Sequence, residues 1–346
     1  MKKFLLLVVF AIVGVTQIWA GEPIAKRDTL YILGVGNSWT RDSMRWLSAI
    51  AKSVGRPVVV GHAYLGGSTL EQQYNGIDNP EYTYKHGKVN QVVHSTYQYW
   101  FYDCSENPVK NPSKGYRNGL NGIGVTLESV VVDKPWEIVV LQPESTARRY
   151  NLAKGGTFDL NLLVERIKKM MKPEVASKAR FGLMVPFSYP QGNTDYRKNV
   201  YMMYNNGVKP ASQAEWDALY EKMHHILQSD TREIGKAMGD NCQFYVNVGL
   251  AIYNGRQDKK ISQSGYKLQR AQNNTHLSEG LAMYIASLAY AYTLLDIKQE
   301  DVKFFPKYSK DPQLTGDRGK TDLITVENTP ALAKRARKIA WKACKK

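Results

Sequence analysis

The sequence predicts an α/β protein, a doubly wound three-layer α/β/α sandwich in which helices cover both faces of a mostly parallel sheet. Three observations lead to this class. Short apolar runs of strand length alternate with amphipathic patterns of helical period, the alternation repeats along most of the chain, and turn residues separate the segments. A regular strand–helix alternation makes successive strands parallel, because each connecting helix must cross a face of the sheet.

The predicted strands are short runs of apolar and β-branched residues. Few polar side chains interrupt them, which is typical of strands buried on both faces of a sheet. The first run, LYILGVG, leads directly into the polar residues Asn37 and Ser38. The five predicted strands cover residues 30–36, 58–63, 137–141, 181–185 and 243–248.

The predicted helices follow the strands. In the first, Met44, Leu47, Ile50 and Val54 share one face, and Gly55 is a stop signal. The last is apolar on nearly all sides, so we expect it to be largely buried. The five predicted helices cover residues 42–54, 120–132, 158–171, 214–238 and 278–295. A further helix begins near the C-terminus, capped by Thr329 with Pro330 at its first position.

A long connection rich in aromatic residues, at about residues 72–117, interrupts this alternation. A loop of this length inside a compact domain is usually an elaboration or a functional segment. Two interpretations remain open: the rings form a platform for sugar C–H groups, or they pack the insertion onto the domain. The rings are those of Tyr74, Tyr82, Tyr84, Tyr97, Tyr99, Trp100, Phe101, Tyr102 and Tyr116.

The N-terminus has the pattern of a secretory signal peptide. Lys2 and Lys3 precede an apolar stretch, and Ala20 offers a small residue at a plausible cleavage point. We therefore expect a signal peptide at 1–20, a main domain at 21–297 and a basic extension at 298–346 that ends in a helix. Secretion or export to the periplasm follows, without stable membrane insertion after the signal is cleaved.

Charge and cysteine content narrow the function classes. The net charge is +16, which favours acidic partners such as anionic polysaccharide. Secretion and the lack of a recognition motif argue against nucleic acid. Cys104, Cys242 and Cys344 are far apart, in neither a disulfide framework nor a metal-ligand spacing. We expect no metal and no other cofactor.

Four groups of polar or glycine residues offer the parts of a hydroxyl nucleophile site. Ser38 follows the first strand, and Gly66 and Gly67 follow the second. Gln142 follows the third strand, and His276 precedes the last core helix. Sites in such sheets form beyond the carboxyl ends of the strands, and a hydroxyl nucleophile needs a base and oxyanion donors. Each residue also has a structural explanation, for example Ser38 as a helix cap.

Together these residues resemble the SGNH (GDSL-like) hydrolase superfamily. The nucleophile block appears as Gly36-Asn37-Ser38, where many members have Gly-Asp-Ser. Gln142-Pro143-Glu144-Ser145 is similar to the Gln-Gly-Glu-Ser block of sialate-O-acetylesterase-type carbohydrate esterases. The last block appears as Asn273-Asn274-Thr275-His276-Leu277-Ser278. The blocks keep the family order over residues 31–284, in a pattern closest to a branch of secreted bacterial proteins.

The resemblance implies an SGNH/flavodoxin-like sandwich and a role for each residue. Ser38 would be the nucleophile and His276 the general base. The backbone N–H of Ser38, that of Gly66 or Gly67, and the side-chain amide of Gln142 would hold the oxyanion.

The chain departs from the family at the triad acid, which is usually an aspartate three residues before the histidine. Asn273 stands there instead, and an amide cannot supply the charge that stabilises an imidazolium. Three outcomes stay open. Ser38 and His276 act as a dyad oriented by Asn273 or a backbone carbonyl, another carboxylate such as Glu144 or Glu279 substitutes, or the site binds without turnover.

We therefore expect a secreted serine esterase that removes acyl groups, most plausibly acetyl, from carbohydrate or polysaccharide through an acyl-enzyme on Ser38. The alternative is a catalytically impaired protein on the same fold that binds glycans.

Overall fold

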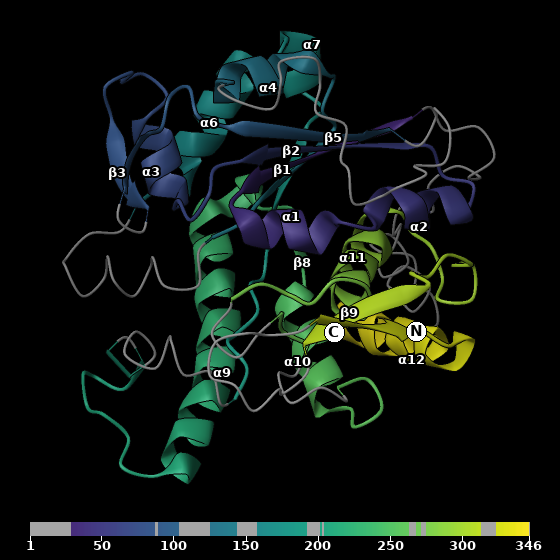
Figure 1. The fold of residues 1–346 in the computed structure, drawn as a ribbon. Helices are drawn as coiled ribbons and strands as arrows, with labels where there is room; N and C mark the ends of the chain where they lie inside the picture. The colour runs from purple at the N-terminus through teal and green to yellow at the C-terminus, as the bar shows by residue number, and fades with distance from the viewer. Residues whose placement is uncertain are drawn as a thin grey trace, which may run out of the picture.

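A six-stranded sheet forms the middle layer of the protein (Figure 1). The structure is a computed structural model. It describes residues 29–86, 89–103, 125–143, 158–191, 201–202, 204–262, 268–270, 275–312 and 323–345. The predicted signal peptide at 1–20 lies outside the described residues.

The strand order of the sheet is β5-β2-β1-β6-β7-β8. Five strands are parallel, and only β5 at the edge runs antiparallel to its neighbour β2. The predicted doubly wound α/β class is therefore confirmed, in the flavodoxin-like arrangement. The strands are β1 (Leu30–Gly36), β2 (Val58–Tyr64), β5 (Gln98–Asp103), β6 (Ile138–Leu141), β7 (Arg180–Met184) and β8 (Phe244–Val246).

The strand order reverses at β1, which lies between β2 and β6. Val35 of β1 pairs with Ala63 of β2 on one side and with Leu141 of β6 on the other. Connections leave β1 and β6 toward opposite sides at such a point, and the crevice they open is where α/β sheets place their sites. The polar residues that follow β1, β2 and β6 therefore lie close together at the carboxyl ends of these strands.

Side chains alternate between two apolar cores, one on each face of the sheet. Ile32 and Val60 belong to one core, while Leu33 and Val59 belong to the other. Helices α1, α2, α10 and α11 cover the first face, and α3, α4, α6 and α7 cover the second (Figure 1). The helices are α1 (Ser38–Met44), α2 (Leu47–Ser53), α3 (Leu70–Asn75), α4 (Leu127–Asp133), α6 (Leu160–Met170), α7 (Pro173–Ala176), α10 (Val248–Gln257) and α11 (Leu281–Leu294).

The predicted helix at 42–54 is two helices, α1 and α2, with α1 beginning at Ser38. A hydroxyl from α11 explains the break. Ser287 Oγ accepts a hydrogen bond of 2.9 Å from Trp46 N and donates one of 2.8 Å to the Ser43 carbonyl. These bonds replace intrahelical partners at the junction. The earlier start of α1 places Ser38 and Asp42 on the same helix.

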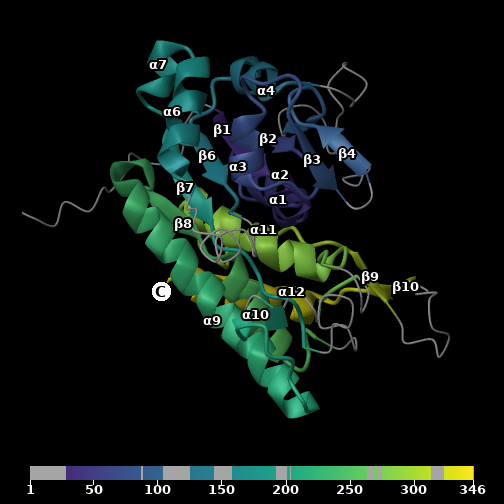
Figure 2. The ribbon, with the colours of Figure 1, turned by 90° about the vertical axis from the view of Figure 1, so that its left-hand side faces the viewer.

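The long helix α9 (Gln213–Met238) leads into η2 (Gly239–Asn241) and runs beside α10 (Figure 2). The predicted bounds for this helix are nearly those observed, because Ser212 caps it by accepting from Glu215 N. The sequence pattern does not predict α10: it extends the last strand to Val248, which is the first residue of this helix. Of the fourteen residues of α11, all but Thr293 are buried, as its apolar pattern predicts.

The aromatic insertion packs onto the sheet through the rings that can be described. Tyr84 and Tyr97 are buried in the second core, and Tyr74 packs against Phe158 with ring centroids 5.2 Å apart. These rings favour the packing interpretation over an open platform. The insertion contains the hairpin of β3 (Thr83–His86) and β4 (Val89–Val92), followed by β5.

The C-terminal extension adds an outer layer beyond α11 (Figures 1 and 2). Helix α12 (Pro330–Cys344) begins at the predicted cap, Thr329, and packs against α10 and α11. Its buried stripe is alanine-rich, so α12 can approach both helices closely. The hairpin of β9 (Tyr308–Pro312) and β10 (Leu323–Glu327) precedes it. In the described part of the chain, no helix has the length and apolar character needed to cross a bilayer.

Candidate active site

Ser38 lies at the carboxyl end of β1, at the start of α1, and is half-buried. Asn37 caps the helix, because its side-chain oxygen accepts a hydrogen bond of 3.0 Å from Trp39 N. Gly36 is needed for the close approach of strand and helix. A Cβ at this position would lie 2.4 Å from Thr40 Oγ1 and 2.9 Å from Gln142 Cβ. The turn therefore holds Ser38 tightly at the edge of the sheet.

Gln142 braces this turn from the neighbouring strand β6. Its Oε1 accepts hydrogen bonds of 3.2 Å from Asn37 N and from Thr40 Oγ1, and the residue is 2% exposed. Its Nε2 donates to the Pro143 carbonyl at 3.0 Å. The amide carries a second hydrogen, which is the one that an oxyanion could use. The structure thus places Gln142 against the turn that carries Ser38 and gives it a bracing role that the sequence did not reveal.

The glycine turn after β2 also adjoins Ser38. Leu65 N donates to the Gly36 carbonyl at 3.0 Å, and Asn37 Nδ2 donates to the Ser68 carbonyl at 3.2 Å. These bonds hold both ends of the glycine turn against the segment that precedes Ser38. Gly67 has φ +62°, a conformation that favours glycine. Gly66 and Gly67 thus lie between two residues that contact the segment preceding Ser38.

His276 binds Asp42, a residue that sequence reasoning did not select. The distance between His276 Nδ1 and Asp42 Oδ2 is 2.8 Å. The Asp42 side chain is 1% exposed and that of His276 is 25% exposed. Asp42 follows Ser38 by four positions on α1, so the two side chains lie on the same face of the helix. The structure therefore places the Ser38 hydroxyl and the Asp42 carboxylate on one face of α1, with the His276 imidazole in contact with the carboxylate.

The charge on Asp42 is stabilised in spite of its burial. Burial alone would raise the pKa of the Asp42 carboxyl. The hydrogen bond and charge of His276, together with the charges of Arg41 and Arg270, outweigh it and hold the pKa below its usual range. Arg41 lies 3.3 Å and Arg270 3.9 Å from Asp42 Oδ1. An ionised carboxylate at Nδ1 favours the tautomer with its hydrogen on that nitrogen, in which the ring lone pair lies on Nε2.

Two of the carboxyl and amide candidates for orienting His276, Asn273 and Glu144, lie outside the described residues. Glu279 lies 3.8 Å from Arg270 Nη2. Arg270 therefore contacts both Glu279 and Asp42, and in the described part of the chain Asp42 is a carboxylate that lies at His276 Nδ1. A predicted helix that began at Ser38 would have placed Asp42 four residues later on the same face. That spacing is the sequence signal that could have identified Asp42 as a candidate acid.

Among the described residues, no group of three or more histidine, cysteine, aspartate or glutamate side chains could hold a metal ion. Cys242 and Cys344 are free thiols, and Cys104 lies outside the described residues. His62 on β2 is 1% exposed. Burial and the nearby charge of Arg41 lower its pKa to about 3, so this imidazole is neutral.

The chain matches no family model and no curated protein. It is similar to the crystal structure of a DUF4886 family protein from Bacteroides uniformis, with a TM-score of 0.61 and 17% identity. The match covers 91% of this chain and 95% of that one. At this identity the likeness shows a shared fold and nothing further.

Two weaker likenesses carry no argument. One is to a protein from Slackia heliotrinireducens described as "a putative SGNH hydrolase", with a TM-score of 0.36, 14% identity, and coverage of 77% of this chain and 100% of that chain. The other is to BT4096, a gut microbial diltiazem-metabolizing enzyme, with a TM-score of 0.32 and 11% identity. That match covers 84% of this chain and 55% of the other.

Proposed function

We propose that this protein is a secreted serine esterase of the SGNH type that removes acyl groups, acetyl above all, from carbohydrate. The observation that carries the proposal is the 2.8 Å contact between His276 Nδ1 and Asp42 Oδ2, with Asp42 one helical turn beyond Ser38. Nucleophile, base and orienting acid are the three parts of a serine hydrolase site, and geometry rather than sequence order identifies them.

In the proposed reaction, His276 Nε2 takes the proton of Ser38 Oγ as the oxygen attacks the ester carbonyl. The backbone N–H of Ser38, that of Gly66 or Gly67, and the Gln142 amide hold the oxyanion. The sugar hydroxyl leaves with the proton from His276, and the acyl group stays on Ser38. His276 then deprotonates a water that attacks the acyl carbon, and the acid product leaves as Ser38 regains its proton.

Asp42 favours an active esterase over a protein that binds without turnover, which is the choice that Asn273 left open. A charged, buried carboxylate at Nδ1 can stabilise the imidazolium that forms in the reaction, which an amide cannot do. The argument for a glycan-binding protein without turnover rested on the missing acid, so it loses most of its support. The preference for carbohydrate rests on the similarity of the Gln142 block to carbohydrate esterases. Secretion rests on the signal pattern at 1–20.

The test is hydrolysis of 4-nitrophenyl acetate by the mature protein beside its Ser38→Ala variant. The wild type should turn over the ester at a rate that Ser38→Ala reduces to the uncatalysed background. Equal rates in the two proteins would exclude Ser38 as the nucleophile and favour the binding alternative. Release of acetate from acetylated xylan and from acetylated sialic acid then separates the carbohydrate classes.

A further inference from the structure

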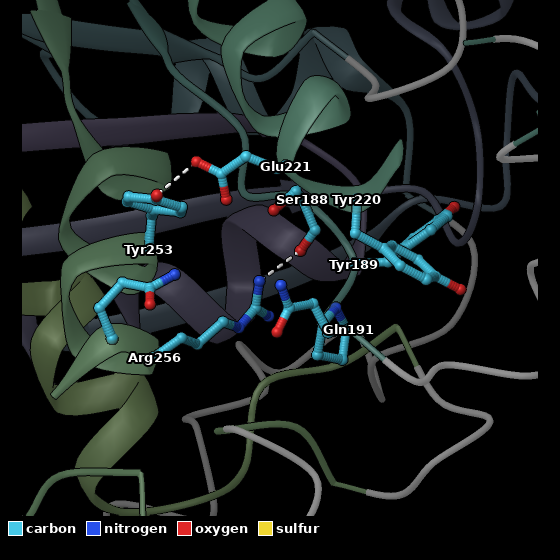
Figure 3. Close-up of a pocket in the computed structure, with 9 residues that line it drawn as sticks. Ser188, Tyr189, Gln191, Tyr220, Glu221, Tyr253 and Arg256 are labelled. Atoms are coloured by element: carbon cyan, nitrogen blue, oxygen red, sulfur yellow. Dashed lines mark hydrogen bonds between the residues drawn. The ribbon is translucent and has the colours of Figure 1, made fainter. Parts of the chain in front are cut away.

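A half-open hollow lies between the loop after β7 and helices α9 and α10, and it measures about 310 Å³ when the open solvent at its mouth is included (Figure 3). Neither the residues predicted from the sequence nor those of the candidate triad line it. The loop, α9 and α10 each contribute an aromatic and a polar side chain. These are Tyr189 and Gln191 from the loop, Tyr220 and Glu221 from α9, and Tyr253 and Arg256 from α10.

The polar groups of the pocket are held in place by hydrogen bonds. The Tyr253 hydroxyl donates to Glu221 Oε1 (Figure 3), and His225 Nε2 lies 3.2 Å from the same oxygen. Both contacts use Oε1, so Oε2 is the atom that we expect to accept from a ligand. Arg256 donates to the Ser188 carbonyl at 2.6 Å. Burial lowers the pKa of its guanidinium, which still carries its charge near neutral pH.

This lining suits an uncharged molecule rich in hydroxyl groups. Tyr189 and Tyr220 are buried, and the half-exposed Tyr253 ring stacks on His224 at 4.0 Å, so the apolar surface for C–H groups is the remaining face of Tyr253. A carboxylate, an amide and a guanidinium accept from and donate to hydroxyls. Glu221 and Arg256 bring opposite charges to one small space, so the pocket gains little from a net charge on the ligand. A carboxylate on the ligand would face Glu221 at the cost of like-charge repulsion.

The pocket is connected to both sides of the candidate active site. Trp39, the residue after Ser38, stacks on Phe187 at 4.4 Å and meets the Tyr189 ring edge-on at 6.1 Å. On the other side, Arg256 donates to Gln269 Oε1 at 2.6 Å. Gln269 pairs with Leu277, the residue after His276. A group bound in the pocket is thus held by segments that lead directly to the nucleophile and to the base.

We propose that this pocket binds an uncharged sugar unit of the acylated carbohydrate, adjacent to the unit whose ester bond is cleaved. The proposal rests on the proposed esterase function and deepens it by assigning a subsite for the glycan. Glu221 is the residue that selects for hydroxyl groups and against uronic acids at this subsite.

Direct binding tests the subsite without turnover. The Ser38→Ala protein is titrated by calorimetry with xylotetraose, mannotetraose, chitotetraose and the acidic tetragalacturonate. At least one neutral tetrasaccharide should bind, and Glu221→Gln in the same background should weaken it about tenfold, as expected for loss of one charge-assisted hydrogen bond. Glu174→Gln is the matched control, since this exposed glutamate lies on α7 at the other face of the sheet. It should bind as the parent does.

Three results would overturn the proposal: no neutral tetrasaccharide binds, binding is indifferent to both Glu221→Gln and Gln191→Ala, or tetragalacturonate binds more tightly than every neutral probe. Gln191→Ala at the half-exposed rim guards against a folding defect in the α9 variant.

Hydrolysis of 4-nitrophenyl acetate separates this proposal from the esterase proposal, because that ester has no sugar. Glu174→Gln, which lies outside both the subsite and the candidate triad, should hydrolyse it at the wild-type rate. If the wild-type protein shows no esterase activity but still binds sugar in a way that depends on Glu221, the esterase proposal is wrong and the subsite proposal stands.

Discussion

Replacing Asp42 with asparagine tests the candidate triad most directly. The change is nearly isosteric and removes the negative charge beside His276 Nδ1. At 2.8 Å and an effective dielectric constant of about 20, the attraction between unit charges is about 6 kcal/mol. This corresponds to a fall in kcat of about 10⁴-fold if the full imidazolium charge develops. Arg41 and Arg270, left without the carboxylate, would oppose the imidazolium further.

The assay is the pre-steady-state and steady-state hydrolysis of 4-nitrophenyl acetate by wild type, Asp42→Asn and Ser38→Ala, each checked by thermal unfolding. We expect Asp42→Asn to retain its fold and to lose between 10³- and 10⁴-fold in kcat. Asn273→Ala is the matched control and should lose less than tenfold. If Asp42→Asn stays within tenfold of wild type while Asn273→Ala loses the activity, the assignment of Asp42 as the orienting acid is refuted.

Three further predictions concern the surroundings of the triad. Gly36→Ala should lower the free energy of unfolding by about 1–3 kcal/mol and reduce kcat, because the added Cβ would collide with Thr40 and Gln142. Denaturant unfolding measures the change in stability, and ester hydrolysis measures the change in kcat. Gln142→Leu should cost about 2 kcal/mol of stability through two lost hydrogen bonds and about 10²-fold in kcat; unchanged kcat would show that its amide holds no oxyanion. His62 binds its proton only in the unfolded state between pH 6.5 and about 3, so stability should fall by about 2 kcal/mol from pH 7.5 to pH 5. The His62→Gln protein should lose that part of the pH dependence, and parallel slopes for the two proteins in urea titrations would contradict it.

The sheet and the last core helix could be predicted because their signals are local. The run LYILGVG is apolar throughout, and β1 has the predicted bounds. The apolar pattern of α11 likewise predicted its burial. The predicted helix boundaries differ from the observed ones where a residue from another element bonds to the helix backbone, as Ser287 does between α1 and α2. No property of residues 38–54 alone indicates that a hydroxyl 241 positions away divides this helix.

Asp42 illustrates what the sequence could not provide for the site. Placed at the start of a helix at 42–54, it looks like an ordinary acidic residue of a first turn. It becomes a candidate acid only when the helix begins at Ser38 and the fold brings His276 and Arg270 to it. The resemblance to a known family pointed instead to the position three residues before His276. A buried carboxylate needs partners, and these partners come from a distant part of the chain.

Ser38 and Asp42 are carried by a single seven-residue helix, and this has an evolutionary consequence. Helical pitch sets their separation, so substitutions elsewhere leave that spacing intact. His276 arrives from a different segment, ahead of α11, and its position depends on how that segment packs. We therefore expect substitutions to be tolerated to different degrees in the two segments. Residues 36–42 should vary little among related proteins, whereas the segment around His276 should vary more as substrate preference changes.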